Sequence, residues 1–432
     1  MGGFCKAIKI EGKGLETLII IAAAILLTGK AAWQTALGLL NRAYVKEKSI
    51  SPPETVRQVM DEGTFSKAVA YTLDKNRFEL FSIWYGSIIL AVLLFSGILP
   101  WFYQQFFAAG DGPLLLGESI FLIATMLMVS FTGLPLEYYS QFRLEERYGF
   151  NKSTRKLWVA DKIKGLVIGL AMGVFLISLI IYLIFRLGDW WWLWAFALVF
   201  TVQLVMMVVY PMLILPWFNK LTPLPTGELK EKLMALAERT GFKTRTIQVM
   251  DGSKRSGHAN AFFTGFGRFR RIVLFDTLVN QLEPPELEAV LAHEIGHYRK
   301  GHVPKMLALS AAMILAGFAL VAWLLKTPAL VQSFGFAPES VGPAPALLLF
   351  SLLAGLATFW LSPLLNLLSR KYEYEADRFA AAHTAGKQPI TMALRKLSEK
   401  NLANLTPHPL YSGFYHSHPT LVEREKALSE TS

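Results

Sequence analysis

Two histidines four residues apart, in the pentapeptide His293-Glu294-Ile295-Gly296-His297, are the residues of this chain best suited to chemistry. Residues four apart lie about 40° from each other around an α-helix, so both imidazoles would point the same way. Two neutral imidazoles at this spacing supply half of a zinc site, and the adjacent glutamate can activate water. The alternative is a surface helix with two unrelated histidines, which is uncommon in a chain with only 8 His among 432 residues.

A second segment offers the third ligand. Glu373 and Asp377 are four apart in the run 366–377, which continues directly from an apolar stretch, so on a helix they share a face. A carboxylate from Glu373 would complete a His₂Glu set and leave the fourth position to water, which is the arrangement of catalytic zinc. Asp377 is suited to accept the free N–H of a ligating imidazole. Glu375 falls on a different face and is not expected to bind the metal. The sequence therefore predicts one Zn²⁺ per chain.

The composition indicates a membrane protein. Hydrophobic residues make up 53% of the chain, charged residues 17%, and the mean hydropathy is +0.38, which lies outside the usual range of soluble proteins. Apolar runs long enough to cross a bilayer predict about seven spans, near 16–40, 80–104, 114–136, 165–187, 190–215, 304–325 and 344–367. Glu118 in the third span is expected to face a wet interior, because a charge facing lipid is costly. The single cysteine, Cys5, excludes an intrachain disulfide and a cysteine-based zinc site.

The net charge of +11 is unevenly distributed. Seven Lys and Arg residues lie between the first two spans and seven more between spans three and four, whereas the loops of the other face hold almost none. This positive-inside pattern predicts an outside N-terminus and places the 216–303 segment and the C-terminus in the cytoplasm. Lys6, Lys9 and Lys13 conflict with this pattern, because they place positive charge at the N-terminus, which is predicted to be outside. Such loops favour contact with the lipid bilayer over binding of nucleic acid, and no nucleic-acid partner is expected.

The elements that position the histidines follow from local patterns. Glu283-Pro-Pro-Glu286 is a helix-start signal shortly before the pentapeptide. Upstream, an amphipathic helix is predicted from an N-cap at Thr226 to a stop at Gly241, followed by short strands near 246–250, 259–264 and 271–275. Asn260-Ala261-Phe262 is a candidate edge strand for an extended peptide substrate; an ordinary structural strand is the alternative.

The predicted organisation therefore has four parts. Residues 1–215 hold spans one to five, 216–303 form a cytoplasmic metalloprotease segment, 304–370 hold spans six and seven, and 371–432 form a cytoplasmic C-terminal segment with the third ligand.

Several motifs together resemble the integral-membrane type I CAAX prenyl endopeptidase family. They are the HExxH pentapeptide, the 366–377 pattern Asn-x-x-Ser-Arg-x-x-Glu-x-x-Ala-Asp, the tail from His416-Ser-His418-Pro to Arg424, and the segments at 146–152, 216–220 and 251–261. The similarity runs in order from Asp74 to Arg424. The 366–377 block is more specific than HExxH, which many unrelated zinc proteases share. The 216–290 segment looks shorter than in eukaryotic members, which indicates a shorter homologue.

The resemblance implies an all-α polytopic membrane protein. It would have about seven transmembrane helices around a large hydrated chamber, with a small cytoplasmic α+β zinc-protease cap. By the same resemblance, the metal ligands would be His293, His297 and Glu373, Glu294 would be the general base, and His418 would assist the tetrahedral intermediate. Asp377 and Arg424 would be supporting residues, and Asn260 and Ala261 would face the substrate backbone.

The function predicted from these features is hydrolysis of peptide bonds in membrane-associated or prenylated peptides and proteins. His416 competes with His418 as the oxyanion donor, and the other histidines outside the pentapeptide show no partner pattern: His258, His302, His383 and His408. A general quality-control protease without prenyl specificity is the alternative within the same chemistry. A transporter or an inactive zinc-stabilised scaffold is the alternative outside it, but a scaffold gives no reason for a base beside the first ligand.

Overall fold

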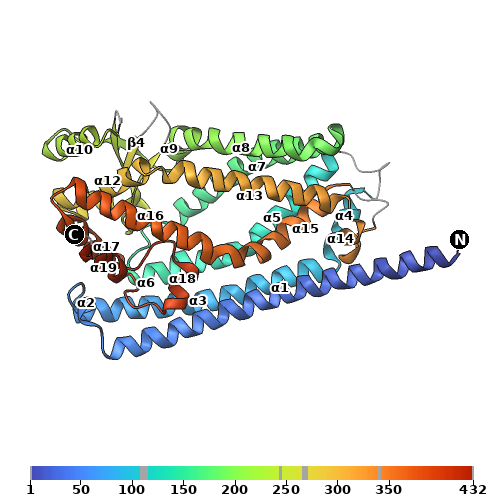
Figure 1. The fold of residues 1–432 in the computed structure, drawn as a ribbon, viewed down its shortest axis with the longest axis horizontal. Coiled ribbons are helices and arrows are strands. Elements are labelled where there is room, and N and C mark those ends of the chain that lie inside the picture. Colours follow the sequence, from blue (N-terminus) through green and yellow to red (C-terminus); the bar gives the residue numbers. More distant parts are fainter. Residues whose placement is uncertain (1, 108–114, 243–245, 265–270, 338–341, 431–432) are drawn as a thin grey trace.

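Seven long apolar helices dominate the described part of the chain (Figure 1). The computed structural model describes residues 2–107, 115–242, 246–264, 271–337 and 342–430. The long helices are α1 (Gly2–Ile50), α3 (Glu62–Phe95), α5 (Leu115–Tyr139), α7 (Arg155–Arg186), α8 (Trp191–Val209), α13 (His302–Leu325), and α15 (Ala344–Thr358), which continues into α16 (Ser362–His383). Short helices connect them: α2 (Glu54–Arg57), α4 (Ile98–Phe107), α6 (Glu146–Tyr148), α9 (Leu215–Phe218) and α14 (Pro328–Ser333). The predicted number of seven spans is confirmed in the described residues, and position 114 of the third span lies outside them.

The second span differs from its predicted bounds. The run 80–104 was expected to be one helix, but α3 ends at Phe95 and α4 begins at Ile98. Gly97 lies between them with a φ of +78°, a left-handed conformation that residues with a Cβ rarely adopt. Hydropathy alone could not locate this break, because α4 is as apolar as the helix before it.

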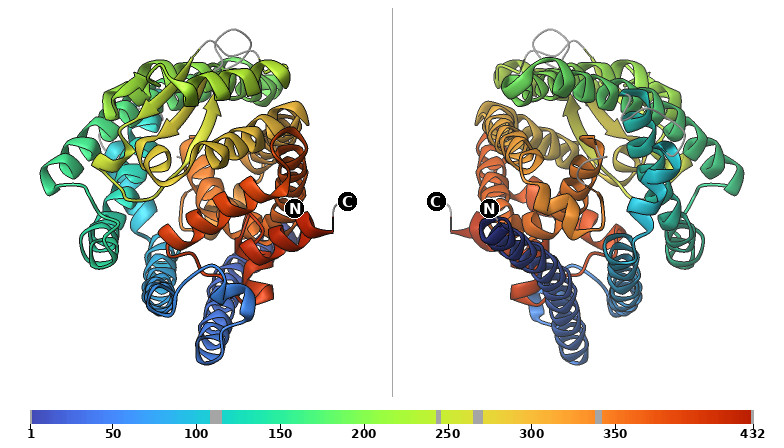
Figure 2. Two further views of the ribbon diagram at one scale, coloured as in Figure 1. Left: turned by 90° about the vertical axis from the view of Figure 1, so that its left-hand side faces the viewer. Right: turned by 90° about the vertical axis from the view of Figure 1, so that its right-hand side faces the viewer.

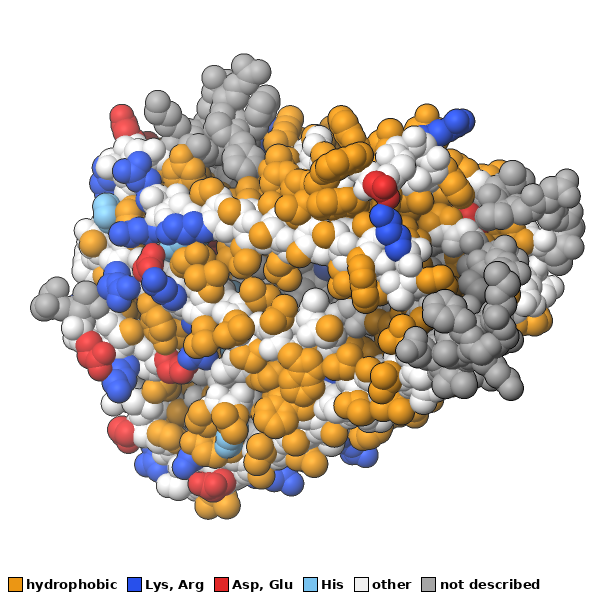
Figure 3. Space-filling view, turned by 45° about the vertical axis from the view of Figure 1, so that its right-hand side comes forward, with side chains coloured by type: hydrophobic (Ala, Val, Ile, Leu, Met, Phe, Trp, Pro, Cys, Tyr) orange, Lys and Arg blue, Asp and Glu red, His pale blue; other side chains and the backbone are white. Residues whose placement is uncertain are grey.

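The membrane helices form a rough ring when the molecule is viewed end-on (Figure 2). Hydrophobic side chains cover much of the surface along the helices, whereas charged side chains gather at the end that carries α12 and α17 (Figure 3). Two cavities open beside the candidate site in the described residues, with volumes of about 1140 and 870 Å³. A hydrated chamber larger than these stays a prediction.

A small sheet and four helices form a cap at one end of the ring. The strands β1 (Leu221–Pro223), β2 (Ile247–Met250), β3 (Ala261–Thr264) and β4 (Arg271–Phe275) lie in the order β1-β2-β4-β3, with β2 and β4 parallel and the other pairs antiparallel. Strand β3 is therefore an edge strand, as expected. The helices α10 (Glu228–Arg239), α11 (Asp276–Gln281), α12 (Pro284–Arg299) and α17 (Lys387–Lys400) cover the sheet through one buried apolar core.

Two details of the cap differ from the sequence interpretation. Gly227, with a φ of +153°, precedes α10, so Thr226 is not its N-cap. Gly241 does end the helix with a left-handed φ of +67°. The three-residue strand β1 was not predicted.

The C-terminal segment returns to the cap through α18 (Pro409–Tyr415) and α19 (Leu421–Ser429). The described connections that contain α2 and α6 lie at the same end of the molecule as this cap, and the N-terminus lies at the opposite end (Figure 1). The basic loops and the cap therefore lie at the same end of the molecule.

Glu118 does not face a wet interior. Its side chain is fully buried, accepts a hydrogen bond from the backbone N–H of Ala344 at 2.7 Å, and contacts the hydroxyl of Tyr103. Ala344 begins α15, so the carboxyl group lies at the N-terminal end of a helix, where the macrodipole favours negative charge. The expectation was wrong because only the packing of α5 against α15 reveals this partner.

Candidate active site

The two histidines of the pentapeptide lie on the buried face of α12. This helix begins with a capping box, in which the Glu283 and Glu286 side chains each bond to the other's backbone N–H. His293 is 8% exposed, and its Nε2 lies 3.1 Å from Nε2 of His297. The local sequence therefore fixes both the start of the helix and the common direction of the two rings.

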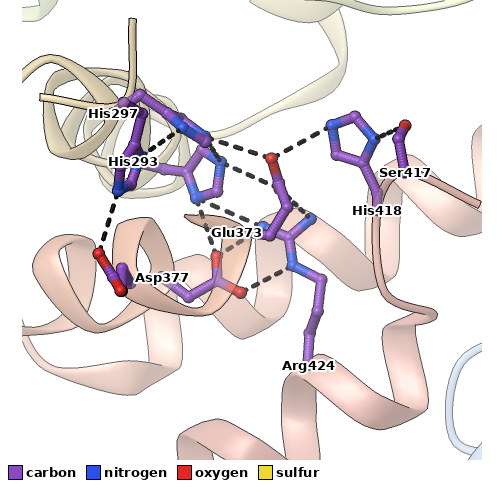
Figure 4. Close-up of polar contacts among 9 residues, drawn as sticks. His293, His297, Glu373, Asp377, Ser417, His418 and Arg424 are labelled. Carbon is purple, nitrogen blue, oxygen red and sulfur yellow. Dashed lines mark hydrogen bonds and ion pairs between the residues drawn. The ribbon is translucent and has the colours of Figure 1, made fainter. Parts of the chain in front are cut away.

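Helix α16 brings the carboxylate of Glu373 to the same point. Its Oε1 lies 3.3 Å from His297 Nε2, and its Oε2 lies 3.4 Å from His293 Nε2. The close approach depends on Gly296, where an added Cβ would stand 3.1 Å from the Ala376 backbone. Figure 4 shows the three side chains converging from two helices.

This group fits a metal ion. The potential ligand atoms of His293, His297 and Glu373 all lie within 4.8 Å of one another. Glu373 is 4% exposed, and its Oε2 has no hydrogen-bond partner among the described residues. This oxygen has only long contacts, to His293 Nε2 at 3.4 Å and to Arg424 Nη1 at 3.7 Å, and a buried carboxylate oxygen without a close donor is costly unless a cation binds it. The donor set of two imidazoles and one carboxylate is that of a catalytic zinc site.

Asp377 and Arg424 support this group. Asp377 Oδ1 lies 2.9 Å from His293 Nδ1, and Arg424 donates to both Asp377 oxygens, at 2.7 and 2.5 Å. Burial favours the neutral imidazole, but the hydrogen bond to Asp377 and the nearby Glu373 carboxylate outweigh it and raise the pKa of His293 to about 9. The two carboxylates thus dominate the surroundings of His293, although the Arg424 guanidinium lies 3.4 Å from its Nδ1. The predicted support residues are all brought together.

Glu294 lies apart from the three clustered side chains and lines a cavity. It is not part of the metal-compatible group in the described chain, and it lines the 870 Å³ cavity together with His297. Burial raises the pKa of its carboxyl group, which makes the carboxylate a better proton acceptor near neutral pH.

The geometry distinguishes the two histidines of the tail. His418 Nε2 lies 3.3 Å from Glu373 Oε1, and the ring is directed towards the cluster (Figure 4). His416 contacts Ser412 and the ring of Tyr411 instead. His418 is therefore the one of the pair beside the cluster.

The candidate substrate strand adjoins the 870 Å³ cavity. Asn260 is exposed, and its side chain accepts from the backbone N–H of Ala261 at the start of β3. The next two residues, Phe262 and Phe263, line the same 870 Å³ cavity as Glu294. The edge strand β3 and Glu294 therefore adjoin the same cavity.

Sequence reasoning missed two residues near the cluster. His302 Nδ1 lies 3.0 Å from His297 Nδ1, and His302 Nε2 lies 3.1 Å from Glu375 Oε2. The only signal was the five-residue spacing between His297 and His302. No linear pattern could pair His302 with Glu375, because this contact depends on how α13 packs near α16.

The remaining histidines lie elsewhere. His258 stacks on Phe150 and contacts Asn401 and Glu145. His383 stacks on Phe379 in α16 and contacts its backbone carbonyl, and His408 caps α18.

Known proteins match the chain over almost its whole length. Residues 41–220 match the family described as CAAX prenyl protease N-terminal, five membrane helices, and residues 223–432 match peptidase family M48. CAAX prenyl protease 1 of Saccharomyces cerevisiae is 36% identical over 433 residues, covering 91% of this chain and 92% of that protein. The Arabidopsis thaliana homologue is 38% identical over 388 residues, covering 87% of this chain and 90% of that protein. The Homo sapiens homologue is 33% identical over 439 residues, covering 92% of each.

The fold has a solved counterpart. The crystal structure of S. mikatae Ste24p matches with a TM-score of 0.88 and 34% identity, and the match covers 95% of this chain and 99% of that one. These whole-chain figures do not test the length of the 216–290 segment, which stays a prediction. Together with the membrane helices and the His-His-Glu group, they lead to one conclusion: the chain belongs to peptidase family M48, in its integral-membrane CAAX prenyl protease branch.

Proposed function

We propose that this membrane metallopeptidase binds one Zn²⁺ through His293, His297 and Glu373. The proposal is supported most by the buried Glu373 carboxylate, whose Oε2 has no hydrogen-bond partner among the described residues and whose two oxygens each lie near one of the imidazole nitrogens. When bound, zinc acts as a Lewis acid that lowers the pKa of water to about 7 and so supplies a nucleophile at neutral pH.

The surrounding residues perform the proton transfers. The Glu294 carboxylate accepts the proton of the attacking water and later returns it to the nitrogen of the leaving amine. His418 Nε2–H donates to the oxyanion that develops on the scissile carbonyl; removal of such a donor typically costs about 10²–10³ in rate. Asp377, held by Arg424, accepts from His293 Nδ1–H and keeps Nε2 free for the metal.

The edge strand β3 is proposed to bind the substrate backbone. Main-chain groups of Asn260 and Ala261 would pair with an extended peptide, which gives affinity without selecting particular side chains. The adjoining cavity of about 870 Å³ falls in the range of ligand pockets and is lined by the apolar side chains of Met207, Met306 and Leu307.

The proposed substrates are prenylated CAAX-type peptides and proteins at a bilayer. The support is that similar proteins of Arabidopsis thaliana, Saccharomyces cerevisiae and Homo sapiens are named as CAAX prenyl protease 1 or its homologues. The basic loops at the cap end favour a cytoplasmic active site and C-terminus.

A paired substrate tests the prenyl specificity. Purified protein is given a farnesylated CAAX peptide and its unprenylated twin, and peptide release is followed by mass spectrometry. We expect the farnesylated peptide to be cleaved with the higher kcat/KM and Glu294→Gln to cleave neither. Equal cleavage of both peptides would contradict prenyl recognition and favour a general membrane peptidase.

A further inference from the structure

His302 lies between a proposed metal ligand and an acidic residue. Its Nδ1 is 3.0 Å from Nδ1 of His297, and its Nε2 is 3.1 Å from Oε2 of Glu375. The three side chains come from α12, α13 and α16. His302 is only 3% exposed, whereas the side chains of His297 and Glu375 are 19% and 23% exposed.

Glu375 determines where the protons lie in the row of contacts from Glu375 through His302 to His297. A carboxylate only accepts hydrogen bonds, so His302 Nε2 must carry a proton and donate it. The neutral ring then has a lone pair at Nδ1, which accepts from His297 Nδ1–H. His297 is thereby left with a free lone pair on Nε2, the nitrogen that faces Glu373 at 3.3 Å.

The orientation of His302 is also held by packing. The ring stacks on Tyr372 with centroids 4.1 Å apart and planes 12° from parallel. Gly301, with a left-handed φ of +68°, ends the turn after α12 and places His302 at the first position of α13. The stacking on Tyr372 and the backbone turn at Gly301 therefore both hold the ring of His302 in place.

The two proposed histidine ligands thus differ in the side chains that hold their Nδ1 atoms. His293 is held directly by Asp377, whereas His297 is held by a neutral ring with a carboxylate behind it. We propose that His302 and Glu375 are positioning residues that fix the metal-binding tautomer and direction of His297. This inference rests on the proposed metal site.

Paired substitutions separate the hydrogen bond from the packing. His302→Phe keeps a ring to stack on Tyr372 but removes the acceptor, whereas His302→Gln loses the stack but offers an amide oxygen. In the same way, Glu375→Leu removes the acceptor, and Glu375→Gln keeps one. Zinc affinity of the full-length protein in detergent is measured by competition with a chromophoric chelator, together with the visible spectrum of the Co²⁺-substituted protein.

We expect His302→Phe and Glu375→Leu to weaken zinc binding about 10- to 100-fold, the usual cost of losing such a support. Their Co²⁺ spectra should change, and the two Gln variants should stay closer to wild type. The matched control is His383→Phe, because His383 also stacks on an aromatic ring of α16 but does not contact the cluster.

If His302→Phe and Glu375→Leu both kept the zinc affinity and the Co²⁺ spectrum of the wild-type protein, the inference would be overturned. Equal losses in His302→Phe and His302→Gln, with Glu375→Leu unchanged, would also overturn it, because packing alone would then explain the effect. If His302→Phe does not fold, the comparison of Glu375→Leu with Glu375→Gln tests the inference instead. Absence of zinc binding in the wild-type protein would instead refute the proposed metal site.

Discussion

At the scale of single residues, Glu294 and the three proposed ligands have separate tasks. The ligands meet at one point between α12 and α16, whereas Glu294 lines the cavity beside β3. Neighbouring residues on a helix project about 100° apart, which explains why the side chains of His293 and Glu294 face different surroundings.

Glu294→Gln should separate metal binding from catalysis. The substitution keeps size and hydrogen bonding but removes the base, so the variant should fold and retain zinc. Peptide hydrolysis should fall by more than the roughly 10²–10⁴ usual for one acid–base group, because activation of the water fails as well. Metal analysis and turnover on one preparation check this; near-normal turnover would refute the assigned role.

At the scale of elements, the site depends on how closely α12 approaches α16. Gly296 permits this approach, since an added Cβ would stand 3.1 Å from both the Ala376 Cα and the Phe379 Cβ. The spacing of the two helices therefore sets the distance between the histidines and Glu373.

Gly296→Ala should push these helices apart. We expect a destabilisation of about 1–3 kcal/mol, typical of overpacking, and weaker zinc binding, measured by thermal unfolding and chelator competition. The control is Gly355→Ala in α15, because a Cβ there would meet nothing within 4 Å. Equal effects of the two substitutions would show that the close approach does not control the site.

Much of this arrangement could be predicted from the sequence because its signals are local. The HExxH spacing, the capping box at Glu283 and the apolar runs each lie within one element. Three features could not be predicted in this way. The strand β1 has only three residues and includes Pro223, the break at Gly97 lies inside an apolar run, and the partners of Glu118 and His302 come from helices distant in sequence.

At the scale of the whole molecule, the basic connections and the cap lie at one end, opposite the N-terminus (Figure 1). Positive charge near the ends of spans is retained on the cytoplasmic side. The orientation of the molecule in the membrane would thus place the proposed site where cytoplasmic proteins can reach it.

Cysteine labelling tests this orientation. After removal of Cys5, the only natural thiol, a cysteine is introduced at Arg155, which is exposed at the start of α7. An impermeant reagent should label it only after the cells are opened. A cysteine introduced beside the N-terminus serves as the outside control. Efficient labelling of position 155 in intact cells would reverse the assignment.

Metal removal tests the central claim most directly. Full-length protein is stripped with a chelator and reloaded with zinc, and its zinc content and peptide hydrolysis are measured on the same samples, with His293→Ala/His297→Ala as the control. We predict one zinc per chain, loss of hydrolysis on stripping, recovery on reloading, and neither zinc nor activity in the double variant. Stoichiometric zinc in that variant, or undiminished hydrolysis by the stripped protein, would contradict the account.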